Sequence, residues 1–400
     1  MNIAIIGGGA SGLACAISAA KKGNKVTIYE KNNKVGKKIL VTGNGRCNYF
    51  NDDFNITKYN SSNKDILCNV INDNNKNKVL DFFNSIGIVP KVVNGYYYPV
   101  TNQATTVKES LEIEAKRLGV NISLDTNIID IDYKDNKYIL ITNDNKILVD
   151  KLVLATGSCA SPNTGSDGIG YKFASKFNHS IIKPLPALVQ LEGNEKYFKD
   201  WAGVRCDANI SLYENDKYIK SEYGEIQLTD YGVSGICIYQ LSSYIIRNLD
   251  NNKEVLSINF LPWLDIEIRK YLDSRNKLMP NRTISMLLDG LLNYKLVNLI
   301  LNKNKIDSNL SYDKLSDTDI ENICNDLIMF KLKITGYKGF DKSQVASGGV
   351  PLTEINIDTF ESNIQPGLYI IGELLDVDGM CGGYNLGFAW ISGLIAGENI

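Results

Sequence analysis

Histidine is almost absent from this sequence, since His179 is the only one among 400 residues. A His-rich metal site is therefore excluded, and we expect no metal ion. A Ser/His/Asp or Cys/His mechanism would have to use this one side chain. The position of His179 after the helix-like segment YKFASKFN predicts a structural residue near a helix C-terminus instead.

Paired cysteines, long apolar runs and an excess of one charge are also missing. The eight cysteines include no C-x-x-C pair, which favours reduced thiols and a cytoplasmic protein. No run of about 18 apolar residues occurs, so we expect no membrane partner. The formal net charge of −2 gives no support to a nucleic-acid partner. A small-molecule substrate is the remaining expectation, and the oligomeric state stays open.

The first 30 residues alternate between element types. The pattern predicts a strand at residues 2–6, a glycine-rich turn at 7–12, a small-residue helix at 13–22 and a second strand at 25–30. This order is that of a βαβ unit, so the sequence begins as an α/β protein with a parallel sheet.

The rest of the sequence changes character several times. An amphipathic helix is predicted at residues 108–118, a β-meander at 121–150, and a buried parallel strand from Lys151. Strand-type patterning follows at 187–261 and helical patterning at 264–330. The last segment, GLYIIGELLDVDGMCGGYNLGFAWISGLIAGENI, is again strand, glycine-rich turn and helix.

A chain of 400 residues exceeds what one hydrophobic core usually serves, so several domains are expected. Because the two ends share one pattern, we expect residues 1–186 and 345–400 to form a single Rossmann-like domain. Residues 187–263 and 331–344 are expected to form a β-rich inserted domain, and residues 264–330 a helical one.

The turn after the first strand carries the pattern G-x-G-x-x-G at Gly7, Gly9 and Gly12. Gly7 permits the tight turn, Gly9 lets the backbone approach a pyrophosphate, and Gly12 allows close packing of helix and strand. Glu30, at the end of the next strand, is placed to accept hydrogen bonds from a ribose. The motif predicts a dinucleotide site; the alternative is a tight turn without a ligand.

The C-terminal segment favours FAD over NAD as the dinucleotide. GLYIIGE places Gly372 and the acid Glu373 at the end of a strand, which suits a ribityl hydroxyl group. CGGYN opens a helix at Gly383, and a helix N-terminus suits the N1/C2-carbonyl edge of a flavin, where charge collects upon reduction. No second G-x-G-x-x-G occurs, so a separate NAD(P)H domain is not expected.

Four segments together resemble a known family: GGGASGLACAISAAKKG…VTIYEKNNKVGKKILVTGNGRCNYFN, LATGSCASPNTGSDGIGYKFA, SQVASGGVPLTEINIDTFES and GLYIIGELLDVDGMCGGYNLGFAWISGLIAG. They are similar to the bacterial FAD-dependent oxidoreductases of the aminoacetone-oxidase type, a family that includes a proposed reductase of unsaturated 3-oxo bile acids. The resemblance implies a glutathione-reductase-like Rossmann FAD domain with an inserted β-barrel-like domain that carries a helical insert.

The resemblance also implies the cofactor contacts, to the pyrophosphate, the ADP portion, the adenine, the ribityl chain and the isoalloxazine ring. The implied residues are Gly7, Gly9, Ala10, Ser11, Gly12, Glu30, Lys31, Lys38, Asn44, Gly45, Arg46, Cys47, Asn48, Ile129, Thr156, Gly157, Gly372, Glu373, Asp378, Gly383, Tyr384 and Asn385. FAD is thus the expected cofactor, with NADH or NADPH as electron donor.

Four residues beside the expected ring position are candidates for catalysis. Arg46 is a candidate for polarising a substrate carbonyl or the flavin edge, although it could instead pair with the FAD phosphate. Tyr96 and Tyr98 are candidate proton donors or stacking platforms, or packing residues only. Cys47 could form a flavin-coupled dithiol with Cys381, but their separation lacks the usual C-x-x-C spacing.

The expected activity is NAD(P)H-fed reduction of an enone-like small molecule, with hydride transfer from flavin N5. An amine oxidase that uses O2, and a flavoprotein redox sensor without a substrate of its own, are the alternatives. The sequence departs from common family patterns at residues 95–99 (GYYYP for Gly-Arg-x-Phe-Pro) and 229–236 (TDYGVSGI for Thr-His-(Phe/Tyr)-Gly-x-Ser-Gly-Pro). These departures leave the substrate open.

Overall fold

The computed structural model describes residues 1–247 and 253–400, which form two compact units. The first unit comprises Met1–Pro186 and Phe340–Ile400, and the second comprises Ala187–Gly339. Each unit has its own hydrophobic core. Residues 340–344 were expected in the β-rich insert, whereas the structure includes them in the first unit. The separation of residues 264–330 as a third domain stays a prediction.

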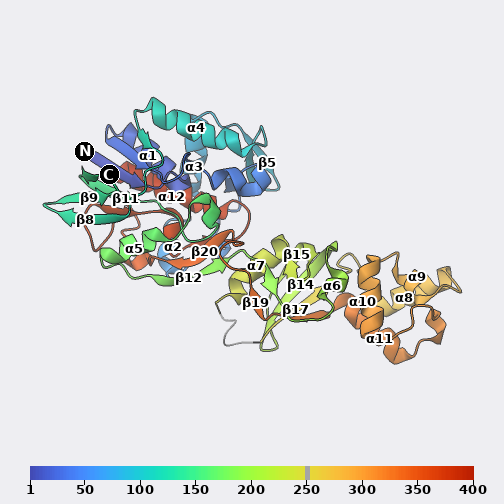
Figure 1. Cartoon of the computed structure of the whole chain (residues 1–400). Coiled ribbons are helices and arrows are strands. Elements are labelled where there is room, and N and C mark those ends of the chain that lie inside the picture. The colour runs from blue at the N-terminus through green and yellow to red at the C-terminus, as the bar shows by residue number, and fades with distance from the viewer. Residues whose placement is uncertain (248–252) are drawn as a thin grey trace. The chain divides into compact units, whose positions relative to one another are not determined.

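A five-stranded parallel sheet lies at the centre of the first unit, with strand order β21-β11-β1-β2-β7 (Figure 1). Near-continuous burial of β1 and β11 is typical of a parallel sheet covered on both faces. The strands are β1 (Asn2–Ile6), β2 (Lys25–Tyr29), β7 (Asn121–Ser123), β11 (Lys151–Leu154) and β21 (Leu368–Ile370).

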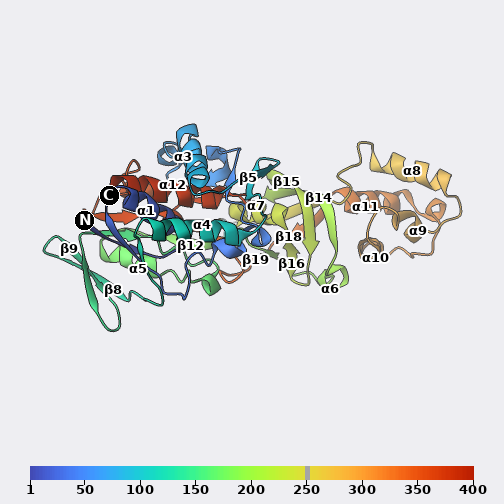
Figure 2. The same cartoon turned by 90° about the horizontal axis from the view of Figure 1, so that it is seen from above.

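Helices from both ends of the sequence pack together on this unit. Figures 1 and 2 show α1 and α12 side by side, in blue and red. In α12, a Cβ on Gly393 or Gly397 would lie 2.4 Å from the Ser11 carbonyl oxygen or 2.5 Å from that of Cys15. The helices of the unit are α1 (Ala10–Lys21), α2 (Lys64–Leu67), α3 (Asp73–Ser85), α4 (Ala104–Arg117), α5 (Ile169–Lys176) and α12 (Tyr384–Asn399).

Several smaller sheets form in the segments that connect the strands of the parallel sheet. One is a hairpin extended by a third strand, in the order β3-β6-β5, and another is the meander β10-β9-β8. The strands are β3 (Phe50–Asn51), β4 (Tyr59–Asn60), β5 (Pro90–Val93), β6 (Tyr96–Pro99), β8 (Asp130–Lys134), β9 (Lys137–Ile141), β10 (Lys146–Val149), β12 (Ile182–Ala187), β20 (Val345–Gly349) and β22 (Asp378–Gly379).

The second unit is built on a seven-stranded sheet, in the order β18-β17-β14-β15-β16-β13-β19. Its strands are β13 (Leu191–Glu192), β14 (Arg205–Glu214), β15 (Lys217–Leu228), β16 (Gly232–Ser234), β17 (Glu254–Asn259), β18 (Phe330–Lys333) and β19 (Gly336–Tyr337). Its helices are α6 (Phe198–Trp201), α7 (Ile236–Ile245), α8 (Ile268–Leu278), α9 (Ile284–Leu288), α10 (Tyr294–Lys303) and α11 (Asp317–Ile328).

Three sequence predictions of secondary structure need correction. The first helix begins at Ala10 rather than Leu13, because Gly9 is its N-cap. Residues 121–123 pair with β2 in the parallel sheet instead of joining the meander. Residues 236–245, within the segment expected to be β-rich, form the helix α7. A short apolar run is compatible with the periodicity of a helix or of a strand, so tertiary contacts decide which of the two forms.

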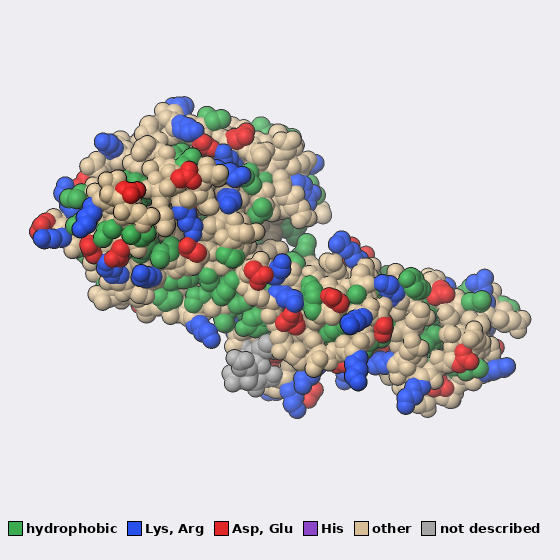
Figure 3. All heavy atoms as spheres, viewed as in Figure 1, with side chains coloured by type: hydrophobic (Ala, Val, Ile, Leu, Met, Phe, Trp, Pro, Cys, Tyr) green, Lys and Arg blue, Asp and Glu red, His purple; other side chains and the backbone are tan. Residues whose placement is uncertain are grey.

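The distribution of surface charge and the length of the apolar helices are relevant to possible partners of the protein. On the face shown in Figure 3, Lys and Arg side chains are interspersed with Asp and Glu, in keeping with the net charge of −2. Within residues 1–247 and 253–400, no helix is long and apolar enough to cross a membrane.

His179 lies three residues beyond the end of α5 and is buried, with 3% of its surface exposed. Its Nδ1 lies 2.8 Å from a carboxylate oxygen of Glu354, and its Nε2 lies 2.8 Å from Ser362 Oγ. Ser362 Oγ already accepts backbone N–H bonds from Ile364 and Gln365, so its own hydrogen is left for His179 Nε2. The neutral imidazole then donates from Nδ1 to Glu354. This network ties together segments 175 or more residues apart.

We predict that His179 makes stability depend on pH. Burial lowers the pKa of His179, against a smaller opposing effect of Glu354. The unfolded chain, with a His pKa near 6.5, therefore takes up the proton first as the pH falls. The free energy of unfolding should fall below about pH 6.5, by up to about 1.4 kcal/mol per pH unit. Urea unfolding at pH 7.5 and 5.5 should show a smaller loss for His179→Asn than for wild type; equal losses would contradict the assignment.

Candidate active site

The turn between β1 and α1 places each glycine of the motif where its size matters. Gly7 has a φ of +106°, and a Cβ on it would lie 2.4 Å from the Ala155 carbonyl oxygen. A Cβ on Gly12 would lie 2.0 Å from the carbonyl oxygen of Gly7. Around a Cβ on Gly9, by contrast, no atom lies within 4 Å. Gly7 and Gly12 are therefore required by packing, and the space beside Gly9 is open to a ligand.

The N-terminus of α1 adjoins this open space. Gly9 is its N-cap, and no side chain caps the helix. The N–H groups of Ala10, Ser11 and Gly12 precede the first intrahelical bond, which Leu13 donates to the Gly9 carbonyl. Free N–H groups at the positive end of a helix dipole bind anions. These residues fit the pyrophosphate of FAD, which would lie where a side chain on residue 9 would point.

Glu30 is buried directly after β2 and is already hydrogen bonded. One carboxylate oxygen accepts the Gly8 N–H at 2.9 Å, and the other accepts the backbone and side-chain N–H groups of Asn32 at 2.8 and 2.7 Å. An ionised carboxylate can accept about four bonds, which leaves roughly one for a ribose hydroxyl group. The structure thus ties Glu30 to the glycine turn, and its contact with the ribose stays a prediction.

The two lysines expected at the ADP portion both form ion pairs. Lys31 Nζ lies 2.6 Å from Asp167, and Lys38 Nζ lies 2.7 Å from Glu373. The structure thus brings together Lys38 and Glu373, two expected cofactor contacts 335 residues apart. The other oxygen of Glu373 accepts bonds from Ser158 Oγ at 2.9 Å and from the Ala346 N–H at 3.1 Å. A ribityl hydroxyl group would have to join this cluster or displace Lys38.

The segments that follow β11 and β21 lie against the glycine turn and the start of α1. Gly372 has a φ of +69°, and a Cβ on it would lie 2.5 Å from Ser11 Oγ. Thr156 Cα lies 3.2 Å from the Cβ position of Gly7, and Gly157 follows it. These expected contacts therefore gather at the carboxyl end of the parallel sheet, where α/β folds bind ligands.

Ile129 lies apart from this group of residues, before β8. Its side chain is exposed, and its N–H donates to the Ile141 carbonyl at 2.8 Å. A backbone contact of Ile129 with adenine would therefore have to use its carbonyl oxygen, and this contact stays a prediction.

The loop GNGRCN has an unusual backbone. Gly43, Asn44, Gly45 and Cys47 all have φ between +55° and +79°. The left-handed region is costly for residues with a Cβ, so Asn44 and Cys47 are held there by their surroundings. The Cys47 N–H donates to the Thr42 carbonyl at 3.0 Å, which closes the loop. The folded loop directs Arg46 to the surface and Cys47 and Asn48 to the interior.

Asn48 meets the N-terminus of α12. Its Oδ1 is buried, accepts no hydrogen bond from the described residues, and lies 2.9 Å from the Cβ position of Gly383. Gly383 is the N-cap of α12, with a φ of +92° and no capping side chain, and Tyr384 begins the helix. The uncapped N-terminus of α12 fits the carbonyl edge of a flavin ring, and a contact of Asn48 with the ring stays a prediction.

Two expected flavin contacts have other partners in the structure. The Asn385 side chain accepts the Gly379 N–H at 2.8 Å and donates to the Gly379 carbonyl at 2.7 Å. Asp378 is buried and accepts a bond from Asn60 Nδ2 at 3.1 Å. Both side chains hold the loop before α12, and the contact of Asn385 and Asp378 with the cofactor stays a prediction.

Three of the four catalytic candidates gather on one hairpin face. The Arg46 guanidinium lies over the Tyr98 ring, 5.0 Å from its centroid, and donates to the Gly43 carbonyl at 3.3 Å. Tyr96 and Tyr98 share one face of β6, and Tyr97 points the other way, toward Tyr49 and Phe50. The Tyr96 ring comes within 2.6 Å of the Cβ position of Gly382, beside α12.

Cys47, the fourth candidate, is fully buried. Burial raises the pKa of its thiol to about 12, so it is protonated at neutral pH. Neither Cys47 nor Cys381 forms a disulfide with a described residue, and the Cys381 thiol donates to Gln344 Oε1 at 3.8 Å. Since the thiolate is the reactive form, the environment of Cys47 argues against a nucleophilic or redox role.

Two residues of this region were not anticipated from the sequence. Ser158 is fully buried and donates to Glu373. The Tyr171 hydroxyl group is buried and has no partner among the described residues. Burial, followed by the nearby Cys159 thiol and the carboxylate of Glu373, raises the pKa of Tyr171. Only the Gly157-Ser158 pair after a predicted strand hinted at this cluster, because its partners lie far apart in the sequence.

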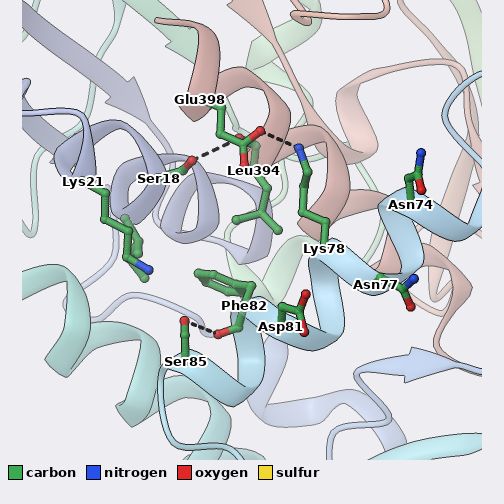
Figure 4. Close-up of a pocket in the computed structure, with 11 residues that line it drawn as sticks. Ser18, Lys21, Asn74, Asn77, Lys78, Asp81, Phe82, Ser85, Leu394 and Glu398 are labelled. Carbon is green, nitrogen blue, oxygen red and sulfur yellow. Dashed lines mark hydrogen bonds and ion pairs between the residues drawn. The ribbon is translucent and has the colours of Figure 1, made fainter.

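A groove of about 510 Å³ lies elsewhere on the first unit, between α1, α3 and α12 (Figure 4). Phe82 and Leu394 contribute apolar surface, and Lys78 forms an ion pair with Glu398. None of the site residues expected from the sequence lines this groove.

We predict that Gly9→Val abolishes FAD binding. Gly9 has a φ of −81°, which Val tolerates, so the loss would reflect side-chain atoms in the pyrophosphate position rather than backbone strain. The purified variant should lack the flavin absorption band while unfolding thermally like the wild type. Gly336→Val, where a Cβ would meet only the Glu192 side chain at 3.2 Å, is the matched control and should retain FAD. A stoichiometric flavin content in Gly9→Val would refute the site.

Comparisons with known proteins agree with the geometry. Residues 1–399 match the family model described as HI0933-like protein Rossmann domain. A 3-dehydro-bile acid delta(4,6)-reductase from Clostridium scindens is 37% identical over 401 residues, which cover 99% of this chain and 98% of the relative. A ribosomal RNA dihydrouridine synthase from Haemophilus influenzae is 29% identical, with 97% and 95% covered.

Solved structures are similar in fold at much lower identity. A 3-ketosteroid-delta4-(5alpha)-dehydrogenase from Rhodococcus jostii has a TM-score of 0.51 at 13% identity, covering 99% of this chain and 96% of that chain. A flavocytochrome c3 fumarate reductase has the same TM-score and identity, covering 100% and 77%. The fold of the chain is therefore similar to that of these proteins. The chain belongs to the HI0933-like Rossmann-domain family and is an FAD-dependent oxidoreductase.

Proposed function

We propose that this protein reduces a carbon–carbon double bond conjugated with a carbonyl in a small apolar molecule, with NADH or NADPH as electron donor. The names of the relatives support this reaction class. A 3-dehydro-bile acid with 4,6-double bonds is a conjugated ketone, and dihydrouridine arises from uridine by reduction of the double bond next to a carbonyl. The two names share the reacting group and differ in the molecule that carries it.

The observation that carries the proposal is the placement of Arg46. Its side chain is exposed, and its nearest partners are the Gly43 carbonyl and the Tyr98 ring. Within the described residues Arg46 forms no ion pair, so most of its five N–H donors remain for a ligand. The Tyr98 ring holds the guanidinium by a cation–π contact without using those donors. Arg46 is thus prepared to bind an oxygen that gains negative charge.

The hairpin that carries Tyr98 has exposed apolar side chains and an exposed lysine, Lys91. Val93 pairs with Tyr96 across the hairpin and is 44% exposed, and Val41, in the segment before the loop, is 62% exposed. Exposed apolar side chains that gather beside polar donors mark binding sites. The valines support an apolar substrate, and Lys91, which pairs with Tyr98 on the same hairpin, would suit an anionic group on it.

Bound FAD would supply the hydride for the β-carbon of the conjugated system. Arg46 would donate hydrogen bonds to the substrate carbonyl oxygen and stabilise the enolate-like charge on it. The Tyr96 hydroxyl, on the same hairpin face and beside the loop before α12, would give its proton to the α-carbon. Tyr98 would position Arg46.

An anaerobic titration of the purified protein tests the proposal. NADH or NADPH should bleach the flavin absorbance, and a 3-oxo-4-ene steroid should restore it without oxygen. Restoration by a uridine-containing ribosomal RNA fragment, and not by the enone, would replace the small apolar substrate by RNA. Reoxidation in air within seconds, with formation of peroxide, would favour an oxidase and contradict the proposal.

We predict that Arg46→Ala retains FAD and lowers kcat/KM for the enone on the order of 100-fold, as when one oxyanion donor is removed. Arg46→Lys should recover part of the activity, because lysine keeps the positive charge but lacks the planar guanidinium that donates two parallel hydrogen bonds. Arg117→Ala, which removes an exposed pair with Glu114 on α4, is the matched control and should behave like the wild type. Wild-type kinetics in Arg46→Ala would refute the role of Arg46.

A further inference from the structure

The hairpin formed by β5 and β6 carries one charged side chain and no acid. Its residues 89–100 read VPKVVNGYYYPV, in which Lys91 is the only charged residue. All four residues of β5 are exposed, and β5 is the edge strand in the order β3-β6-β5. A lysine on an edge strand often serves only to prevent pairing with another chain. The surroundings of Lys91 therefore decide whether it has a further role.

Lys91 lies on the same face of the hairpin as the site of Arg46. Lys91 and Tyr98 are directly opposite each other on the two strands. Such partners share one face of the sheet, and their Cβ atoms are about 4.5–5.5 Å apart. The Arg46 guanidinium lies over the Tyr98 ring, 5.0 Å from its centroid. Two cations thus neighbour one tyrosine, and a single small molecule on this face can contact both.

The charge of Lys91 is not neutralised by the protein. Lys91 forms no ion pair with the described residues, and the acid beside the hairpin, Asp52, pairs with Lys76 at 2.7 Å instead. Asp52 also accepts a bond from the Tyr97 hydroxyl group at 3.3 Å. Because Tyr97 points away from the face that carries Tyr98, this carboxylate is engaged on the opposite side of the hairpin. The ammonium group of Lys91 is left for a ligand.

Exposed apolar side chains lie on either side of Lys91. Val93 is opposite Tyr96 toward the turn of the hairpin. At the open end, the Val100 N–H donates to the Val89 carbonyl at 2.9 Å, and both of these valines are exposed. A neutral apolar ligand on this face would remove water from Lys91 without replacing its hydrogen bonds, which is unfavourable. A ligand with an apolar body and one anionic group would contact the valines and pair with Lys91 as well.

We propose that Lys91 selects substrates that carry an anionic group, such as a carboxylate, over neutral molecules of the same shape. Arg46 would bind the carbonyl oxygen of the enone, and Lys91 would bind the anionic group elsewhere on the same molecule. Discrimination arises because the anionic substrate gains an ion pair and the neutral one only desolvates the lysine. The inference rests on the proposed function, since the enone has to lie against this hairpin.

Two substrates that differ in one charge test the inference. A 3-oxo-4-ene steroid with a carboxylate on its D ring and the methyl ester of the same compound share the enone. Lys91→Met keeps the length of the side chain and removes the charge, so kcat/KM for the acid should fall about fivefold, as for an ion pair at a partly exposed site. The value for the ester should not fall. The loss should lie in KM, because Lys91 contacts a part of the substrate that does not react.

Matched variants separate this role from a general effect of charge or folding. Lys91→Arg should keep the wild-type values for the acid. Lys146→Met removes one charge from an exposed position on β10 and should leave both substrates unaffected. Should Lys91→Met fold poorly, Lys91→Gln replaces it as a second neutral variant, with the same expected result.

The outcomes distinguish the inference from the function on which it rests. If the wild type reduces both steroids and the neutral variant lowers kcat/KM for both equally, or for neither, the inference is overturned and the proposed function stands. If the wild-type holoenzyme reduces neither steroid, the proposed function fails and the inference fails with it.

Discussion

The contact between α1 and α12 is the constraint on which the first unit depends. The helices come from opposite ends of the sequence, and Gly393 and Gly397 let the backbone of α12 approach the Ser11 and Cys15 carbonyls. No larger side chain fits at either position, because the opposing atoms belong to the backbone. This close approach fixes α12 relative to the glycine turn. Its N-terminus is thereby fixed as well, together with the loop that Asn385 holds.

A second consequence is that charged groups meet where the cofactor would bind. Lys38 and Glu373 form an ion pair, and Ser158 and the Ala346 N–H satisfy the other carboxylate oxygen of Glu373. The attraction within a partly buried ion pair offsets the loss of hydration only when further hydrogen bonds satisfy the remaining polar atoms. The cluster therefore joins four segments of the first unit. Polar contacts, in addition to apolar packing, specify how the C-terminal segment returns to the sheet.

Local patterns allowed much of this arrangement to be predicted from the sequence. The β1-turn-α1 unit was predicted because strand period, glycine spacing and Glu30 all lie within 30 residues. The burial of Cys47, the pairing of the Ile129 N–H and the engagement of Asn385 depend on residues far away or on loop conformation, so no local pattern reports them. The helix α7 was missed for a related reason, since its apolar residues pack against a sheet that the sequence does not display.

The region around Arg46 differs from the expected cofactor site in how tightly it is packed. Many of the residues expected to bind the cofactor lie at the ends of the parallel strands and on α1 and α12, where packing permits little change. Arg46, Tyr96 and Tyr98 lie instead on an exposed loop and a hairpin whose β5 side chains are all exposed. Substitutions there cost little stability, because few core contacts are lost. If a carbonyl-binding Arg is retained while the apolar side chains around it change, relatives can keep one reaction class and differ in the molecule that they reduce.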